Sequence, residues 1–228
     1  MVLLYELARG PLVWISTLVF LCGIVIRALQ LFSLTKKKER IFCPAGPPEK
    51  ERLSAPSPEE KKIERIVSFS NRLIGKNPVM ALVSFIFHSC LFIAPLFALG
   101  HSLLFYESWR LPLPSLPDGL IDLLTIVLLA CAFFFLIRRM LIPRVQAIST
   151  AYDYMVLLLT VAPFLTGFFA YHQWLDYKTV ITLHMLAGEA MLVVIPFSKI
   201  GHMVFFFFVR ILVGSETSFW RGNRTWSP

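Results

Sequence analysis

Four histidines lie within apolar stretches of the chain: His88, His101, His184 and His202. A histidine inside a membrane helix is costly, so by default it is a functional residue with a partner. The 18-residue spacing from His184 to His202 corresponds to five turns and ~27 Å of rise on an ideal helix. Both imidazoles then point the same way at different depths. This arrangement suits two metal centres stacked against the same neighbouring helix.

The expected helix with His88 and His101 runs antiparallel to the one with His184 and His202. Depth along the two helices pairs His101 with His184, and His88 with His202. Two bis-histidine sites between two helices are how a bundle holds two b-type haems, which then transfer electrons and do not bind oxygen. The 13-residue spacing of His88 and His101 places them about 140° apart on an ideal helix. Pro95 lies between them and predicts a kink that frees a carbonyl.

The composition indicates where such helices sit. Of 228 residues, 57% are hydrophobic and only 16% are charged, against about 25% charged in a soluble domain. A membrane helix needs ~20 apolar residues, and five stretches qualify. The fold class is therefore an all-α integral membrane bundle of five transmembrane helices. The expected spans are about 11–34, 78–106, 120–137, 152–171 and 179–213.

The basic residues predict the orientation of the bundle. Lys and Arg number eleven in 35–77, three in 138–150 and three from Arg210 onward, whereas the opposite side has only Arg9, Arg110 and Lys178. The positive-inside rule places the N-terminus outside and the C-terminus in the cytoplasm. Because the net charge of +8 comes mostly from segments between spans, it does not indicate a nucleic-acid partner.

The cytoplasmic insertion 35–77 is the one sizeable polar segment. It combines a lysine run, a Pro/Gly-rich stretch and a weakly amphipathic end from about Glu59 to Gly75. Two interpretations stay open. It is a solvated linker with basic anchoring, or it is a docking surface for a soluble partner.

The last span carries a specific pattern: His, three residues, Gly, seven residues, Pro-Phe-Ser, a basic residue, two residues, His. The matching positions are His184, Gly188, Pro196-Phe197-Ser198, Lys199 and His202. This pattern resembles the gamma subunit of respiratory nitrate reductase, a di-haem cytochrome b. Its relatives include the cytochrome b subunits of heterodisulfide reductases and of complexes of dissimilatory sulfur metabolism. The 13-residue histidine spacing and the insertion 35–77 both depart from the nitrate reductase type and favour a relative.

The resemblance implies two haem b groups, a quinone such as menaquinone near the outer face, and a cytoplasmic iron–sulfur partner subunit. It also implies a multi-pass protein of a prokaryotic cytoplasmic (inner) membrane, which acts as an electron-transfer subunit of a respiratory oxidoreductase complex and not as an enzyme alone. Two other classes stay open: a proton-relaying membrane transporter and a haem-free membrane anchor. Only the cytochrome predicts a b-type absorption spectrum.

Five further residues are candidates for the chemistry around such centres. Glu189, His172 and Lys178 are candidates for a quinone and proton pocket, while Lys199 and Arg27 are candidates to neutralise haem propionates. Four of them have a plainer alternative. Glu189 packs as a neutral acid against a neighbouring helix, His172 belongs to the interfacial belt, and Arg27 extends to the membrane surface. Lys199 then serves as a positive-inside anchor.

Overall fold

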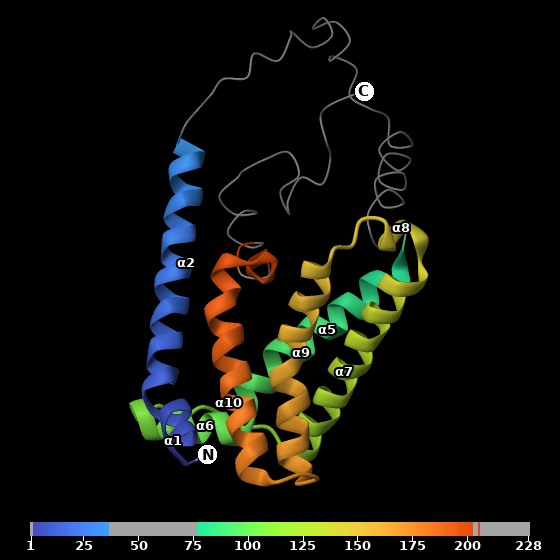
Figure 1. The fold of residues 1–228 in the computed structure, drawn as a ribbon. Helices are drawn as coiled ribbons and strands as arrows, with labels where there is room; N and C mark the ends of the chain where they lie inside the picture. Colours follow the sequence, from blue (N-terminus) through green and yellow to red (C-terminus); the bar gives the residue numbers. More distant parts are fainter. Residues whose placement is uncertain (1, 37–76, 203–204, 206–228) are drawn as a thin grey trace, which may run out of the picture. The chain divides into compact units, whose positions relative to one another are not determined.

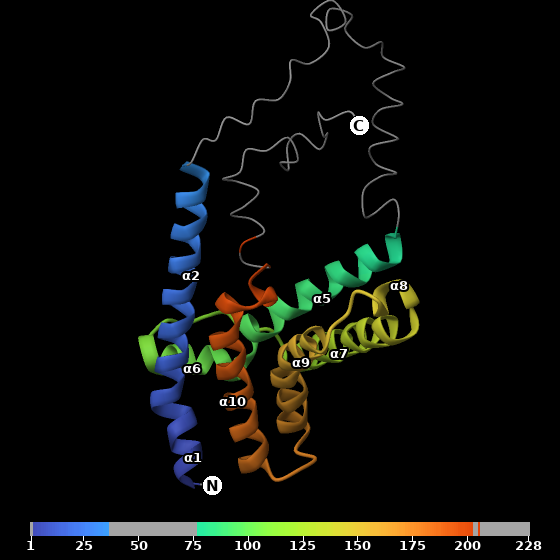
Figure 2. The ribbon, with the colours of Figure 1, turned by 45° about the horizontal axis from the view of Figure 1, so that its top comes forward.

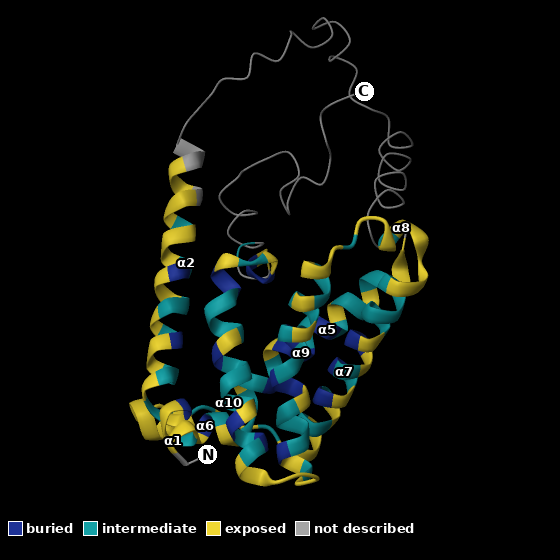
Figure 3. Cartoon of the chain, in the orientation of Figure 1, coloured by how far each residue is buried: buried dark blue, intermediate teal, exposed yellow. Residues whose placement is uncertain are grey.

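The computed structural model describes residues 2–36, 77–202 and 205, and every regular element within these ranges is a helix. Within these ranges, five helices are long and apolar enough to cross a membrane. This confirms the helical class and the expected number of candidate spans. Only 11% to 28% of each apolar window is buried within the chain, and much of the helix surface is exposed (Figure 3). Most of the apolar surface of these windows is therefore not covered by the described part of the chain.

Contacts divide the chain into two units. The first comprises Met1–Ile24 and Leu82–Gly201, and the second comprises Val25–Ala81 and His202–Pro228. In the second unit the structure describes 25–36, 77–81, 202 and 205. Three of the four apolar histidines therefore belong to the first unit, and His202 belongs to the second.

The N-terminal span is a helix with an irregular turn near its start. α1 (Val2–Leu7) continues through a π-helical turn, η1 (Ala8–Leu12), into α2 (Val13–Lys36). Pro11 lies in the π turn, where its missing N–H and its ring are accommodated by the wider backbone. The helix thus begins nine residues before the expected start at 11. Ala8 is fully buried, and α1 and η1 contact the last long helix, α10 (Tyr177–Val194).

The second expected span, 78–106, is two helices and not one. α5 (Pro78–Phe97) ends shortly after Pro95, and α6 (Leu99–Trp109) follows. Ala98 between them is extended, with φ −68° and ψ 133°. Figures 1 and 2 both show α6 running in a different direction from α5. The kink expected at the proline is therefore a full break of the helix, which ends the membrane-length segment at Phe97.

The third and fourth spans match the expected ranges closely. α7 (Asp118–Leu141) is followed by the short α8 (Pro143–Gln146), and α9 (Ala151–His172) comes next. α9 packs against both α7 and α10, and Figure 1 shows α9 and α10 side by side. Asp153 completes a capping box with Thr150 at the start of α9, which satisfies free N–H groups there.

The start of α10 is fixed by Asp176, whose carboxylate accepts hydrogen bonds from the backbone N–H and hydroxyl of Thr179 at 2.9 and 2.6 Å. These two donors lower the pKa of the Asp176 carboxyl. The cap is therefore anionic at neutral pH and is lost only as the pH falls through that lowered pKa.

The last expected span, 179–213, does not continue as one helix. α10 ends at Val194 and is followed by two 3₁₀ turns, η3 (Ile195–Phe197) and η4 (Lys199–Gly201), with Ser198 extended at φ −121° and ψ 177°. Pro196 accounts for the end of the α-helix, since it has no N–H to donate. The expectation that one continuous helix carries both His184 and His202 is therefore wrong. Residues 206–213 lie outside the described part of the chain.

A close contact joins α2 to η3 within the first unit. A Cβ built on Gly23 would lie 2.6 and 2.7 Å from two atoms of the Pro196 ring. The absence of a side chain at Gly23 is thus what allows the proline to approach α2.

We predict that Gly23→Ala lowers the stability of the first unit by about 1–3 kcal/mol, because a rigid ring cannot yield to the added methyl group. Thermal unfolding in detergent, followed by circular dichroism, measures this. Gly188→Ala is the matched control, since nothing lies within 4 Å of its Cβ position; it should be neutral or stabilising. Equal melting temperatures for the two variants would show that the contact does not matter.

Candidate functional site

Two of the four apolar histidines meet between α6 and α10. The ring centres of His101 and His184 are 5.8 Å apart, and the ring planes are within 9° of parallel. Both rings are partly buried. That spacing also occurs in ordinary aromatic pairs. The positions of the ring N–H hydrogens therefore decide whether the two imidazoles have lone pairs available to a ligand.

The helix break at Ala98 orients His101. Because Leu99 starts a new helix, the carbonyl of Pro95 does not accept the usual hydrogen bond from the residue four positions on. Nδ1 of His101 lies 2.7 Å from that oxygen. A carbonyl can only accept, so Nδ1 carries the hydrogen and Nε2 keeps its lone pair.

His184 is oriented in the same way by a neighbouring helix. Its Nδ1 donates to the carbonyl of Pro163 on α9, at 2.8 Å. Gly167, one turn further along α9, makes room for the ring: a Cβ there would lie 3.0 Å from Cε1 and 3.2 Å from Nδ1 of His184. Nε2 of His184 is thus also the lone-pair nitrogen.

These two rings fit a metal that binds one imidazole on each side. Histidines that ligate a metal characteristically donate their other ring N–H to a backbone carbonyl or carboxylate. A metal about 2 Å from each Nε2 would put the ring centres about 6 Å apart, close to the 5.8 Å seen here. Among the residues described, no three or more His, Cys, Asp or Glu side chains gather as a metal site.

His88 has the same tautomer but a different neighbourhood. On α5 its Nδ1 donates to the Ser84 carbonyl at 2.6 Å, and Phe87 packs edge-on at 5.5 Å. Its expected partner, His202, is exposed and belongs to the second unit. The pairing of His88 with His202 stays a prediction.

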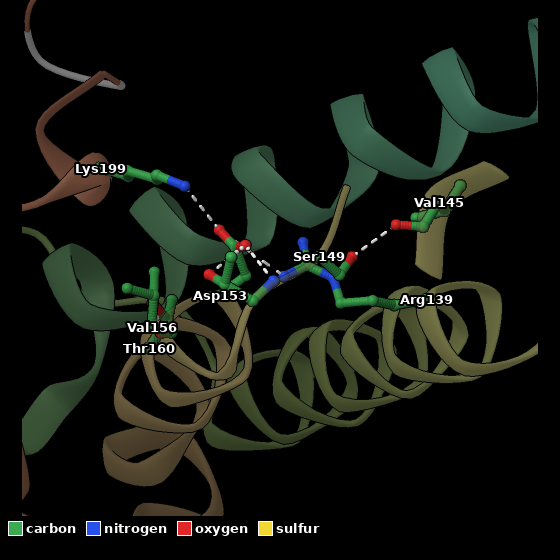
Figure 4. Close-up of polar contacts among 8 residues, drawn as sticks. Arg139, Val145, Ser149, Asp153, Val156, Thr160 and Lys199 are labelled. Carbon is green, nitrogen blue, oxygen red and sulfur yellow. Dashed lines mark hydrogen bonds and ion pairs between the residues drawn. The ribbon is translucent and has the colours of Figure 1, made fainter. Parts of the chain in front are cut away.

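The two residues expected to neutralise propionates have protein partners. Nζ of Lys199 donates to Oδ1 of Asp153 at 2.9 Å, and Arg139 approaches the same oxygen at 4.0 Å; Figure 4 shows this group. Asp153 therefore links α9 to η4 and α7. In the second unit, Arg27 is exposed and its guanidinium lies 3.5 Å from the Gln30 side chain on the same helix.

His172 and Lys178 lie near the turn between α9 and α10 but differ in their contacts. Nε2 of His172 lies 3.0 Å from Oδ1 of Asp122 on α7, whereas Lys178 is exposed. Asp122 was not among the sequence candidates. Its one signal is a carboxyl four residues inside an otherwise apolar span, on the same membrane side as His172.

Glu189 is buried, with 7% of its surface exposed, and neither carboxyl oxygen has a hydrogen-bond partner in the described part of the chain. Thr182 and Glu189 are seven residues apart, so they share one face of α10. Pro196, in the η3 turn beyond the end of α10, contacts Gly23 of α2. Glu189 lies about 140° around α10 from His184, so the structure does not bring it to the face that meets α9.

Comparisons with known proteins bear on the family of the chain. No family model matches it, and no solved structure matches it significantly. A protein of Nitratidesulfovibrio vulgaris (strain Hildenborough) is 30% identical over 226 residues, which cover 99% of this chain and 98% of that protein. The chain belongs to that protein's family. The name of the relative, "Protein", states no ligand or reaction, so inferences about function rest on the site itself.

We predict that Glu189→Leu raises the stability by about 1 kcal/mol, since it replaces an unpaired buried polar group with an apolar one. Thermal unfolding in detergent measures the change. Thr182→Val, on the same face, is the matched control and should be close to neutral, because its hydroxyl only donates to the Lys178 carbonyl on its own helix. A clear loss of stability in Glu189→Leu would mean that the carboxyl has a partner.

Proposed function

We propose that this protein is a membrane cytochrome b that binds one haem b between His101 and His184 and a second between His88 and His202. It carries electrons between a membrane quinone near the outer face and an iron–sulfur partner subunit in the cytoplasm of a prokaryote. One observation carries the proposal: the rings of His101 and His184 are nearly parallel with their centres 5.8 Å apart, and each donates from Nδ1 to a backbone carbonyl.

The side chains of this chain have defined roles in the proposal. His101 and His184 would hold the haem iron through Nε2, and the carbonyls of Pro95 and Pro163 keep each ring in the tautomer with its hydrogen on Nδ1. Those hydrogen bonds also make the imidazoles more electron-rich ligands. A haem held by two imidazoles supplies reversible one-electron transfer without an open coordination site.

The support for the second haem is narrower. Nδ1 of His88 donates to a carbonyl, which gives the tautomer that a ligand needs. His202 closes the sequence pattern that begins at His184. A count of haem per chain separates one site from two.

A proton-relaying transporter is the second candidate function, because Glu189 is a buried carboxyl without a partner among the described residues. Such a protein would use its histidines and Glu189 as proton carriers and would bind no haem. The absorption spectrum of the purified protein distinguishes the two functions.

We predict that the purified chain shows a b-type band in its reduced-minus-oxidised spectrum and two haems per chain by pyridine haemochrome assay. His101→Ala and His184→Ala should each lose one haem, because a single imidazole holds it weakly. His172→Ala is the matched control, since this imidazole is bound to Asp122 and should leave the haem content unchanged.

A further variant covers the case in which the alanine variants fail to fold. His101→Met keeps an axial ligand and should retain haem with a raised midpoint potential. A colourless wild-type protein, or full haem content in the His101→Ala/His184→Ala double variant, would contradict the proposal.

A further inference from the structure

Two buried cysteines lie on the facing sides of α5 and α7. Cys90 is 3% exposed and Cys131 is 9% exposed, and both are free thiols. The ring of Phe87 on α5 packs edge-on against the ring of Phe135 on α7, with the ring centres 5.3 Å apart. Cys90 follows Phe87 by three residues and Cys131 precedes Phe135 by four, and residues so spaced are neighbours on one helix face. Each thiol therefore lies on the face by which its helix meets the other.

The two thiols also lie at a similar depth. The backbone N–H of Leu116, two residues before α7, donates to the carbonyl of Phe97 at the end of α5, at 2.9 Å. Both helices extend from this junction to the contact between the phenylalanine rings, so they run in opposite directions. From that contact, Cys90 lies about 4.5 Å and Cys131 about 6 Å back toward the junction. The two thiols are close enough to interact electrostatically.

The pair offers two sulfur donors and no further ligand. Among the described residues, no three or more His, Cys, Asp or Glu side chains come together at one point. Zn²⁺ takes four ligands in structural sites, and Mg²⁺ and Ca²⁺ take oxygen ligands. Sulfur donors select soft ions such as Cu(I), for which two sulfurs complete a linear coordination. The donor set therefore suits Cu(I) and none of these divalent ions.

The spacing of the helices favours a metal bridge over a disulfide. Unlike α7 and α9, the backbones of α5 and α7 are not in extensive contact, because large rings lie between them. A disulfide needs Cα atoms about 4.4–6.8 Å apart and sulfurs bonded at about 2 Å. A metal ion about 2.3 Å from each sulfur, the length of a Zn–S bond, joins sulfurs about 4.6 Å apart. A metal thus bridges a wider gap than a disulfide can.

We propose that Cys90 and Cys131 bind one Cu(I) ion and that this ion joins α5 to α7. On binding, each S–H bond breaks, its electron pair forms the S–Cu bond, and the proton leaves to solvent. Neither copper nor sulfur changes its oxidation state. The bound group carries one negative charge, and Arg138 lies seven residues beyond Cys131 on the same face of α7, about 10 Å along the helix. Its guanidinium charge favours the anionic complex.

The test is a titration of the purified full chain with Cu(I), without oxygen, against a coloured Cu(I) chelator. The Cys22→Ser/Cys43→Ser background leaves Cys90 and Cys131 as the only two of the four cysteines. We expect this background to retain one Cu(I) per chain. Cys90→Ala or Cys131→Ala, added to it, should weaken binding by more than about a hundredfold, since losing a residue that merely orients a metal ligand already costs about ten- to hundredfold.

Ser89→Ala in the same background is the matched control. Ser89 precedes Cys90, and its hydroxyl donates to the Phe85 carbonyl of its own helix, so this variant should still retain one Cu(I). X-ray absorption at the copper edge of the background protein covers the case in which the alanine variants fail to fold. It should show sulfur neighbours alone.

Four results would overturn the inference: nitrogen neighbours at the copper, unchanged copper retention in a folded Cys90→Ala/Cys131→Ala variant, loss of all copper from the background protein to the chelator, or a disulfide between the two cysteines in the isolated protein. Haem content plays no part in this test. A colourless protein that holds Cu(I) through both thiols would overturn the proposed function and leave the copper site standing.

Discussion

The hydrogen bonds from histidine Nδ1 atoms to backbone carbonyls are the interaction on which the candidate site depends. His101 uses a carbonyl released by the break between α5 and α6, and His184 uses one on the neighbouring helix α9. The Pro95 carbonyl has no donor four residues on, because the helix breaks at Ala98, so His101 satisfies it. The Pro163 carbonyl lies within α9 and also accepts from the Thr166 hydroxyl, so His184 is an additional donor there. In both rings the hydrogen on Nδ1 leaves the lone pair on Nε2.

The two ends of the first unit hold its charged contacts. Near one end Asp122 binds His172, and near the other Asp153 binds Lys199. Each carboxylate joins helices that are distant in sequence. The stretch between them offers few polar partners, and there Glu189 stays buried with both oxygens unpaired in the described part of the chain. A buried carboxyl without a partner lowers the stability of the fold. Such costly groups are expected at positions that function requires.

Much of the fold could be predicted from the sequence. Apolar length alone predicts five helices, and the ranges for α7 and α9 agree to within a few residues, because α7 begins directly after Pro117 and α9 begins at the capping box of Thr150. The helix ends at Phe97 and Val194 could not be placed, since a proline is compatible with either a kink or a break. Packing between helices decides whether the proline kinks or breaks the helix, and the spacing of residues in the sequence does not reveal that packing.

The candidate site was only partly predictable. Depth along two antiparallel spans brings out the pair His101 and His184, but the carbonyls that orient them depend on the break at Ala98 and on α9. The partners of His172 and Lys199 are 50 and 46 residues away in the chain, so no local pattern reveals them. Local motifs identify the reactive side chain, whereas its partner comes from the tertiary structure.

The most direct measurement of the central claim is an electron cryomicroscopy map of the protein purified with its native cofactors and partners. The account predicts density for a planar macrocycle between His101 and His184, continuous with Nε2 of both rings, while Nδ1 of each stays on its carbonyl. A map in which the two imidazoles contact each other directly, or in which iron is held by other side chains, would contradict it.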